Sequence, residues 1–426
     1  MRKTYQICCG VDVHKTFLVA TIVKTTNNLP HYEKKRFSTF AKDLKLLKQW
    51  LLDNNCFDLC MESTGKYWIP VWNMLEDKIN VTIANPKWVS AVKGNKDDTK
   101  DSKWIADLFR MGIVPGSYIP CRAIRILREF TRYRYKLVCM RSSEKNRYQN
   151  AFTVSNCNLD AVVSDMFGKS AMDIENYLLE IDMENFDTEY CKSLLRRSLK
   201  KKADSVIESV ESFNMIVEQK ERIKIIQEHF NDLDTRINRI DEQIEKLIVT
   251  NKWQSAISLI CSIPGIDRHM AITIISEIGT DMTPFSSSKR LCCWAGLTPS
   301  NNQSAGKKKS VKITRAGIYL KPALVQAAHA AVKSTTNPYF KNKYERIYKR
   351  RGKKRAIIAI ARKILTAIYH MFKNGELFNP CDIYKESIPE TVQLHQKKKA
   401  AKQAIKLLVN LGLITEEAVS LELLAS

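Results

Sequence analysis

The chain has 426 residues, 44% hydrophobic and 27% charged, which fits a globular protein of two or three domains. Its 69 lysines and arginines exceed its 45 aspartates and glutamates, and this net charge of +24 favours a polyanionic partner, nucleic acid before membrane. The sequence has no long apolar run and no signal-peptide pattern, so we expect a cytoplasmic protein with no membrane span. Its 12 cysteines include no CxxC pair, so we expect neither a zinc site nor a disulfide framework.

Residues 1–118 alternate strand-like and helix-like segments. Short apolar runs at 7–13, 17–23, 57–61 and 81–84 are typical of strands, and the spacing over 40–52 predicts a helix. Alternation of this kind predicts an α/β domain with a partly parallel sheet.

Strand signals disappear over residues 119–250, where we expect a helical region. Near its end, apolar residues recur at alternating intervals of three and four, which is the heptad spacing of a coiled coil. We interpret this stripe as a dimer interface, although a core-facing helix of a monomeric bundle would show the same spacing. The stripe consists of Ile223, Ile226, Phe230, Leu233, Ile237, Ile240, Ile244 and Leu247.

Residues 251–375 form the next segment, which we expect to be mainly helical. The run Ser262-Ile263-Pro264-Gly265-Ile266 and the apolar spacing after it are similar to a helix-hairpin-helix, whose turn can offer backbone N–H groups to a DNA phosphate. We expect residues 376–426 to form a helical tail, with Lys397-Lys398-Lys399 on a solvated face.

Four acids of the first segment stand at the ends of predicted elements. Asp12 ends the first strand, Glu62 ends a later one, and Asp98 and Asp101 begin a helix that runs to about Met111. A spacing of three puts the two aspartates on one helix face. Oxygen ligands of this kind suit Mg²⁺ or Mn²⁺, and paired ions of this type serve phosphodiester chemistry. Acids at strand ends and helix starts are also common without any such role.

Three segments around these acids resemble the DEDD transposases of the insertion-sequence 110 family, which are relatives of the Piv DNA invertases and are also called bridge recombinases. They are Gly10-Val11-Asp12-Val13-His14-Lys15, Met61-Glu62-Ser63-Thr64-Gly65 and Lys96-Asp97-Asp98-Thr99-Lys100-Asp101. The resemblance implies a RuvC-type, ribonuclease-H-like domain, with Asp12, Glu62, Asp98 and Asp101 as metal-binding and catalytic residues. In the family's third motif Thr stands at the place of Asp97 and Ala at that of Ser102; we take Asp98 as the ligand because its spacing to Asp101 fits.

The C-terminal half also resembles this family, over residues 263–266, 285–299, 304–307 and 313–317. The resemblance implies a transposase domain in which Ser304 is the nucleophile that holds the cut DNA strand. It further implies that Ser304 works with the carboxylate site of another protomer, in a dimer or tetramer. The loop reads Ser304-Ala305-Gly306 where the family has Ser-Gly-Gly; Ser300 and Ser310 are rival serines, and a serine in such a loop can also simply stabilise a turn.

Basic residues gather in two regions. Between Phe285 and Lys363 there are 20 lysines and arginines and one acid, Glu345, which indicates contact with phosphates. In this region we predict nucleic-acid contacts for Lys307, Lys308, Lys309, Lys312, Arg315, Arg350, Arg351, Lys353 and Lys354. In residues 119–250, arginines interleaved with tyrosines suit RNA or single strands, and there we predict contacts for Arg122, Arg125, Arg128, Arg132 and Arg134.

The family resemblance implies the partners: donor and target double-stranded DNA, and a structured noncoding guide RNA, the bridge RNA, bound in part by the helical region 119–250. We therefore expect an RNA-guided recombinase that cuts and rejoins DNA. Two other readings remain open. A RuvC-type structure-specific endonuclease would use the four acids with water as nucleophile, and a non-catalytic nucleic-acid-binding protein would need neither the acids nor the serine.

Overall fold

The computed structural model describes residues 5–27, 29–63, 65–89, 98–299, 302–304, 307–310, 312–335 and 337–380, with backbone only at 87–88, 98–100, 183, 302–304 and 307–309. The chain divides into two compact units, Met1–Cys121 and Arg122–Ser426. Most of the expected C-terminal tail, with Lys397-Lys398-Lys399, lies outside the described residues. None of the described helices combines the length and the hydropathy needed to cross a membrane.

The first unit is built on one mixed sheet of five strands in the order β3-β2-β1-β4-β5. β2 and β3 continue from β1 as an antiparallel meander, whereas β4 lies parallel to β1 and β5 parallel to β4. The predicted α/β class is confirmed, and the sheet with its helices is consistent with a ribonuclease-H-like domain. The strands are β1 (Ile7–Val13), β2 (Phe17–Thr26), β3 (Leu29–Ser38), β4 (Asp58–Glu62) and β5 (Asn80–Ala84).

Helices cover both faces of this sheet. Residues of α1 and α2 join one core, in which Leu47, Leu51 and Val71 are fully buried, and residues of α4 join the other, with Ile105 and Ala106. The helices of this unit are α1 (Ala41–Asp53), α2 (Trp68–Leu75), α3 (Pro86–Val89) and α4 (Asp98–Arg110).

Among the elements that the sequence did not predict are β3 and α2. β3 is an edge strand whose residues are mostly exposed, so it needs no alternation of apolar and polar side chains. α2 is only eight residues long and carries Pro70 in its first turn, where proline is tolerated. Neither element therefore carries the periodic apolar pattern by which strands and helices are recognised.

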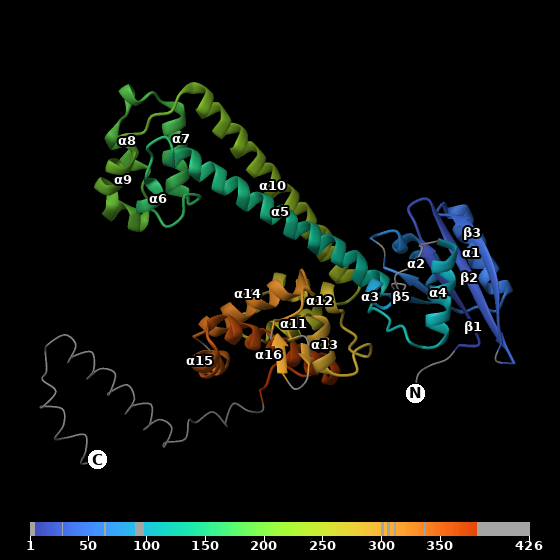
Figure 1. Cartoon of the computed structure of the whole chain (residues 1–426). Coiled ribbons are helices and arrows are strands. Elements are labelled where there is room, and N and C mark those ends of the chain that lie inside the picture. The colour runs from blue at the N-terminus through green and yellow to red at the C-terminus, as the bar shows by residue number, and fades with distance from the viewer. Residues whose placement is uncertain are drawn as a thin grey trace, which may run out of the picture. The chain divides into compact units, whose positions relative to one another are not determined.

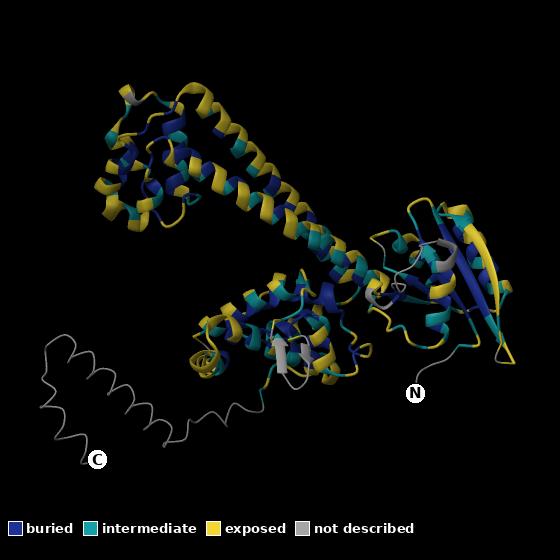
Figure 2. Cartoon of the chain, in the orientation of Figure 1, coloured by how far each residue is buried: buried dark blue, intermediate teal, exposed yellow. Residues whose placement is uncertain are grey.

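The second unit begins with two long helices, α5 (Arg122–Thr153) and α10 (Val217–Thr250), which pack side by side (Figure 1). They are antiparallel, because Arg134 pairs with Asp241 while Arg141, further along α5, pairs with Asp234, which comes earlier in α10. Buried residues follow the contact between the two helices, and exposed residues cover their outer faces (Figure 2).

The heptad stripe of α10 is buried by this pairing and by the tip, the small helical domain that connects the far ends of α5 and α10. Ile223, Leu233, Ile237, Ile240 and Ile244 are at most 8% exposed within the single chain. The stripe therefore packs against the protein's own α5 and tip, as in the bundle alternative. This corrects the interpretation of the stripe as a dimer interface, since these side chains are already covered.

The tip has a hydrophobic core of its own, which includes Phe152, Leu159, Ile174, Leu178 and Val206, none of which is exposed. It comprises α6 (Leu159–Val162), α7 (Lys169–Glu180), α8 (Thr188–Ser193), α9 (Ala203–Val210) and the 3₁₀ helices η1 (Met183–Asn185) and η2 (Arg197–Lys202).

The tip core encloses the carboxyl group of Glu175, which is 0% exposed. Neither of its oxygens, nor the Tyr148 hydroxyl, has a hydrogen-bond partner of normal geometry among the described residues. Burial raises the pKa of Glu175 to about 8, and the nearby Tyr148 hydroxyl offsets only part of this rise. The folded tip therefore holds Glu175 protonated near neutral pH, whereas the unfolded chain ionises it near pH 4.5.

We expect the stability of the tip to fall as the pH rises between about 4.5 and 8, because over that range only the folded state retains this proton. The slope should approach about 1.4 kcal/mol per pH unit. Glu175→Gln should abolish the slope and Glu180→Gln, an exposed change on the same helix, should retain it. Hydrogen exchange of tip amides between pH 5 and 9, corrected for the intrinsic exchange rate, measures the effect; equal slopes in both variants would contradict it.

The rest of the second unit is mainly helical, as predicted, with one two-stranded hairpin. Its last helix has nine fully or nearly fully buried residues and packs against α13, α14 and α15. The elements are α11 (Gln254–Cys261), α12 (Arg268–Ile278), α13 (Ser288–Trp294), β6 (Asn302–Ser304), β7 (Lys307–Ser310), α14 (Leu320–Lys333), α15 (Tyr339–Arg351) and α16 (Lys353–Asn374).

The segment predicted to be similar to a helix-hairpin-helix consists of α11, the Pro-Gly turn and α12. Gly265 has a φ of +84°, and a Cβ there would lie 2.3 Å from the backbone nitrogen of Ala331 in α14, so only glycine fits. Asp267 caps α12 by accepting a hydrogen bond from the Met270 N–H at 2.7 Å. This carboxylate occupies the Met270 N–H, and the close approach of Gly265 to Ala331 packs the turn and α12 against α14.

Candidate functional site

Asp12 and Glu62 end two neighbouring parallel strands of the first unit. In the register of β1 and β4, Val11 lies opposite Met61, so the next residues, Asp12 and Glu62, lie side by side. Both are partly buried. The sequence placed each acid at the end of a strand, and the sheet brings the two ends together.

The two acids also share a face of the sheet. Val11 and Met61 point into the core beneath α1 and α2, whereas Cys8 and Cys60 belong to the core beneath α4. Because side chains alternate along a strand, Asp12 and Glu62 take the α4 side.

α4 runs in the opposite direction to β1. The backbone N–H of Tyr5, before the strand, donates to the Arg110 carbonyl at the end of α4 at 3.1 Å, and the Cys8 thiol lies 3.8 Å from the Ala106 carbonyl. The first turn of α4 is therefore at the same end of the sheet as Asp12. Asp101 lies one helical turn before the buried Ile105, on the side of α4 that faces the sheet.

Gly10 allows α4 to lie directly against β1. A Cβ at Gly10 would be 2.2 Å from the Ala106 nitrogen and 2.4 Å from the Ser102 carbonyl oxygen. The Ser102 hydroxyl is buried here and bonds the Thr21 hydroxyl at 2.8 Å, so the polar residue at this motif position has a partner. These contacts fix the start of α4 over the end of β1.

The four predicted ligands thus belong to elements that meet at one end of the sheet, and all four supply carboxylate oxygens. Among the described residues, however, no three His, Cys, Asp or Glu side chains are grouped closely enough to hold a metal ion. The side chain of Asp98 is outside the described residues. The donor chemistry suits Mg²⁺ or Mn²⁺.

His14 is a residue of this region that the sequence reasoning did not assign. Its Nε2 lies 3.0 Å from an Asp12 carboxylate oxygen, and its ring stacks on Phe17 with centroids 4.5 Å apart. A histidine in this position orients the carboxylate, as outer partners do around metal ligands. The signal was available: His14 follows Asp12 by two residues, the spacing at which an extended chain returns to the same side.

A cleft of about 350 Å³ opens beside His14. The exposed side chains of Lys15 and Lys66 line it, together with Thr39, Tyr67 and Pro70. Two ammonium groups in one cleft can neutralise neighbouring phosphates of a nucleic-acid backbone.

Ser304 is the last residue of β6 and pairs with Lys307 across the turn of the β6–β7 hairpin. The structure describes only its backbone. Of the two rival serines, Ser300 lies outside the described residues, and Ser310 accepts a hydrogen bond from the Lys312 N–H at 3.2 Å, as turn serines do.

Three of the five predicted α5 arginines hold helices together. Arg128 donates to the backbone carbonyls of Ser276 and Glu277, and Arg132 forms two hydrogen bonds to the Glu277 carboxylate at 2.7 and 2.9 Å. Arg134 pairs with Asp241 on α10 in the same way. Arg128 and Arg132 are thus engaged with α12, and Arg134 with α10. Arg122 is exposed and Arg125 half-buried.

The basic residues around the junction of α15 and α16 are exposed, with Gly352 between the two helices at a φ of +78°. No acid lies in the first turn of α16 to offset them. We call these residues the α15–α16 cluster: Lys349, Arg350, Arg351, Lys353, Lys354 and Arg355. Lys312 and Arg315, after the β6–β7 hairpin, are exposed as well; the side chains of Lys307, Lys308 and Lys309 are not among the described ones.

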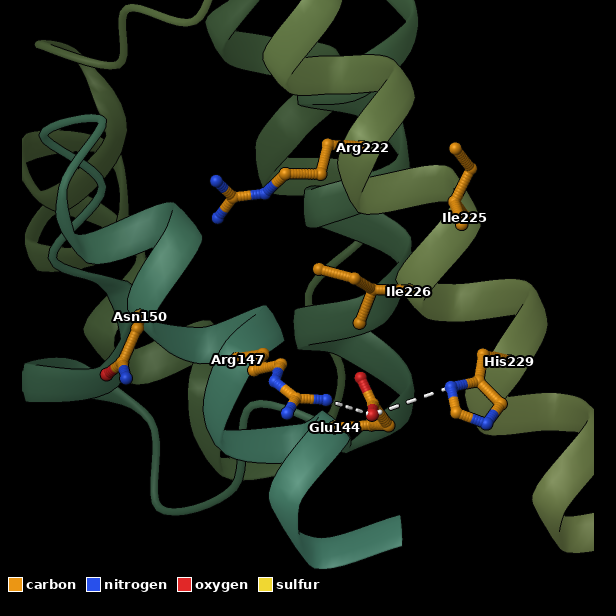
Figure 3. A pocket seen from close by; sticks show the side chains of 7 residues that line it. All are labelled: Glu144, Arg147, Asn150, Arg222, Ile225, Ile226 and His229. Carbon is orange, nitrogen blue, oxygen red and sulfur yellow. Dashed lines mark hydrogen bonds and ion pairs between the residues drawn. The ribbon is translucent and has the colours of Figure 1, made fainter. Parts of the chain in front are cut away.

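A cleft of about 560 Å³ on the α5–α10 hairpin contains Arg147, Arg222 and His229 (Figure 3). Glu144, only 5% exposed, lies between Arg147 and His229, pairing with both; the His229 Nδ1 is 3.5 Å away. The contact of Glu144 with His229 joins α5 to α10, whereas its ion pair with Arg147 lies within α5.

Comparison with known proteins connects both halves of the chain to one group. A DEDD transposase model of the IS110 type matches residues 9–155, and the model described as "Transposase IS116/IS110/IS902 family" matches residues 257–345. The helices of the tip and all of α10 lie between the two matches.

Two curated relatives are similar over part of their length. Pilin gene-inverting proteins of Moraxella bovis and Moraxella lacunata are each 32% identical over 161 residues, which is 35% of this chain and 47% of each relative. The chain thus spans about half the length of the curated relatives it matches. Since the two models match in order and together span more than half of the chain, the chain belongs to the IS110 family of transposases.

Proposed function

We propose that this protein is a DNA recombinase that cuts and rejoins strands. The observation that carries the proposal is the side-by-side placement of Asp12 and Glu62 beneath the start of α4, in a chain of the IS110 transposase family. The printed name of the Moraxella relatives, pilin gene-inverting protein, supports a DNA-rearranging activity.

Asp12, Glu62, Asp98 and Asp101 would hold the divalent cations, Mg²⁺ or Mn²⁺, with His14 orienting Asp12. When bound, such ions supply Lewis-acid stabilisation of the charge that develops in phosphodiester displacement. The chain's own contribution is the fixed start of α4 over the sheet, which brings Asp101 toward the strand ends. Lys15 and Lys66 would hold the phosphates that flank the scissile one.

Ser304 is the proposed nucleophile. Its oxygen forms a bond to phosphorus as the bond from phosphorus to the sugar oxygen breaks; the serine loses its proton and the sugar oxygen gains one. A sugar hydroxyl of another strand then attacks the phosphoserine in the reverse sense, which rejoins DNA without loss of bond energy. The β6–β7 hairpin presents Ser304 within a run of lysines that suits a phosphate.

The nucleic-acid surface in this proposal consists of Arg122, Arg125, Lys312, Arg315 and the α15–α16 cluster, together with Lys307, Lys308 and Lys309. Donor and target DNA, and a structured guide RNA, are the proposed partners, and the proposed homo-oligomer joins the acids of one protomer with Ser304 of another. The heptad stripe does not serve this assembly because it is buried within the chain.

Ser304→Ala tests the nucleophile. We expect this change to abolish the covalent DNA–protein adduct and strand transfer, since no other group would accept the cut strand. Ser310→Ala is the matched control on the same hairpin and should leave both intact. The measurement is trapping of adducts on labelled DNA in denaturing gels, with strand transfer scored in parallel.

The same assay separates the competing functions. If Ser304→Ala still cuts DNA at the unaltered rate and wild type gives no adduct, the protein is a resolvase-type nuclease that uses water. If wild type binds DNA without any cleavage in Mg²⁺ or Mn²⁺, the recombinase proposal fails.

A further inference from the structure

A cleft of about 370 Å³ lies within the second unit, where α5, α12 and the start of α14 meet. Each helix presents one face to it, with lining residues spaced three or four apart, as helix geometry requires. Thr131 and Tyr135 come from α5, Met270 and Thr273 from α12, and Tyr319 and Ala323 from the start of α14.

One side of this cleft is aromatic. The rings of Tyr135 and Tyr319 meet edge to face, with centroids 5.9 Å apart and planes at 86°. The Arg132 guanidinium lies 4.5 Å from the centre of the Tyr319 ring. Tyr135 remains 50% exposed, so its ring is accessible to a flat ligand.

The charges in the cleft are already balanced by neighbouring residues. Arg132 forms two hydrogen bonds to Glu277, and Arg134 two to Asp241. The Asp267 carboxylate caps α12. A phosphate would therefore meet paired guanidinium groups beside carboxylates, whereas an uncharged planar ring meets no such penalty.

Polar groups at the rim can read the edge of such a ring. Gln326 and His269 are exposed, and Thr273 is half-buried. The amide of Gln326 offers both a donor and an acceptor, the pattern that matches the edge of a nucleobase. The cleft volume is within the range of small-ligand sites.

We propose that this cleft holds one unpaired base of a nucleic acid, stacked on Tyr135 and bonded along its edge by Gln326. The inference rests on the proposed nucleic-acid function and adds a subsite to it. Arg315 is exposed and only four residues before Tyr319, so it is at most about 14 Å away along the chain. A strand whose phosphate contacts Arg315 can therefore reach the cleft with a neighbouring base.

The test measures binding of fluorescent single-stranded DNA, single-stranded RNA and duplex DNA by anisotropy. Stacking of one base on an aromatic ring predicts that Tyr135→Ala weakens single-strand binding by at least about five-fold, with duplex binding unchanged. Tyr133→Ala is the matched control, because Tyr133 is 54% exposed on the same helix and does not line the cleft. Gln326→Leu, which keeps the size of the side chain, should weaken binding of some bases more than others.

A second readout is independent of affinity. Oligonucleotides carrying 5-iodouracil should crosslink to Tyr135 or Tyr319 in the wild-type protein, as mapped by mass spectrometry. If Tyr135→Ala weakens binding of single-stranded RNA alone, or of single-stranded DNA alone, the cleft holds a base of that nucleic acid. If it weakens binding of both, the cleft accepts a base from either. Equal single-strand binding by Tyr135→Ala and Tyr133→Ala, with no crosslink in the cleft, would overturn the base subsite. Strand cleavage and transfer by the same protein would still support the recombinase proposal. Absence of all nucleic-acid binding would overturn the subsite and the recombinase proposal together.

Discussion

We expect Asp12→Asn to lower the rate of DNA strand cleavage by more than about 100-fold. Loss of a residue that only supports a metal ligand already lowers metal affinity or activity by about 10- to 100-fold, so loss of a ligand itself should cost more. Asparagine keeps the size of the side chain and its contact with His14 but removes the negative charge that attracts a divalent cation. Glu62→Gln should have the same effect, since the two side chains lie side by side at the ends of β1 and β4. Cleavage of labelled DNA in Mg²⁺ and in Mn²⁺ measures the rates.

Asp58→Asn is the matched control for this experiment. Asp58 begins β4 and Glu62 ends it, so the control removes a carboxylate from the opposite end of the same strand. Asp58→Asn should cleave normally, and all three variants should bind DNA like the wild-type protein. Full cleavage by both Asp12→Asn and Glu62→Gln would remove the acids from the chemistry and leave a nucleic-acid binder or a different active site.

We expect Gly10→Ala to lower the free energy of unfolding of the first unit by at least about 3 kcal/mol. This is the upper part of the range for substitutions that overpack a buried site. The added methyl group would lie 2.2 Å from the Ala106 nitrogen, which is backbone and cannot rotate away. α4 must therefore move off β1, which carries Asp98 and Asp101 away from Asp12. We expect the melting transition of this unit to fall by roughly 10 °C and strand cleavage to be lost below that temperature as well.

Gly116→Ala shows whether this effect is specific. Gly116 is in the same unit, and the nearest atom to its added Cβ is a methyl carbon of the Thr82 side chain at 3.1 Å, which can shift. Calorimetry of the full chain should show little change for this variant. If Gly10→Ala melts like Gly116→Ala and still cleaves, the close contact of α4 with β1 does not position the site.

Local patterns in the sequence were sufficient for much of the fold. The strands at 7–13 and 17–26 and the helices at 41–53 and 98–110 were predicted in type and approximate place, since each has a regular apolar face. β3 was missed because it is an exposed edge strand, and α2 because it is short. The same limit applies to Gly10, whose importance depends on a helix about 90 residues further along the chain.

Sequence by itself determined the α/β character of the first unit, the helical character of the second, the positive charge and the acids at element ends, because these depend on residue type and on spacing along one element. Only the tertiary structure decided which surfaces those residues face. The heptad stripe, ambiguous between two chains and one, is covered by α5 and the tip. Arg128, Arg132 and Arg134, which were predicted to contact nucleic acid, pair within the chain with carbonyls and acids 107 to 149 positions away. The spacing of hydrophobic or charged residues along one element is the same whether they contact their own chain, a second chain or nucleic acid. Which of these they contact depends on packing between elements that are far apart in the sequence.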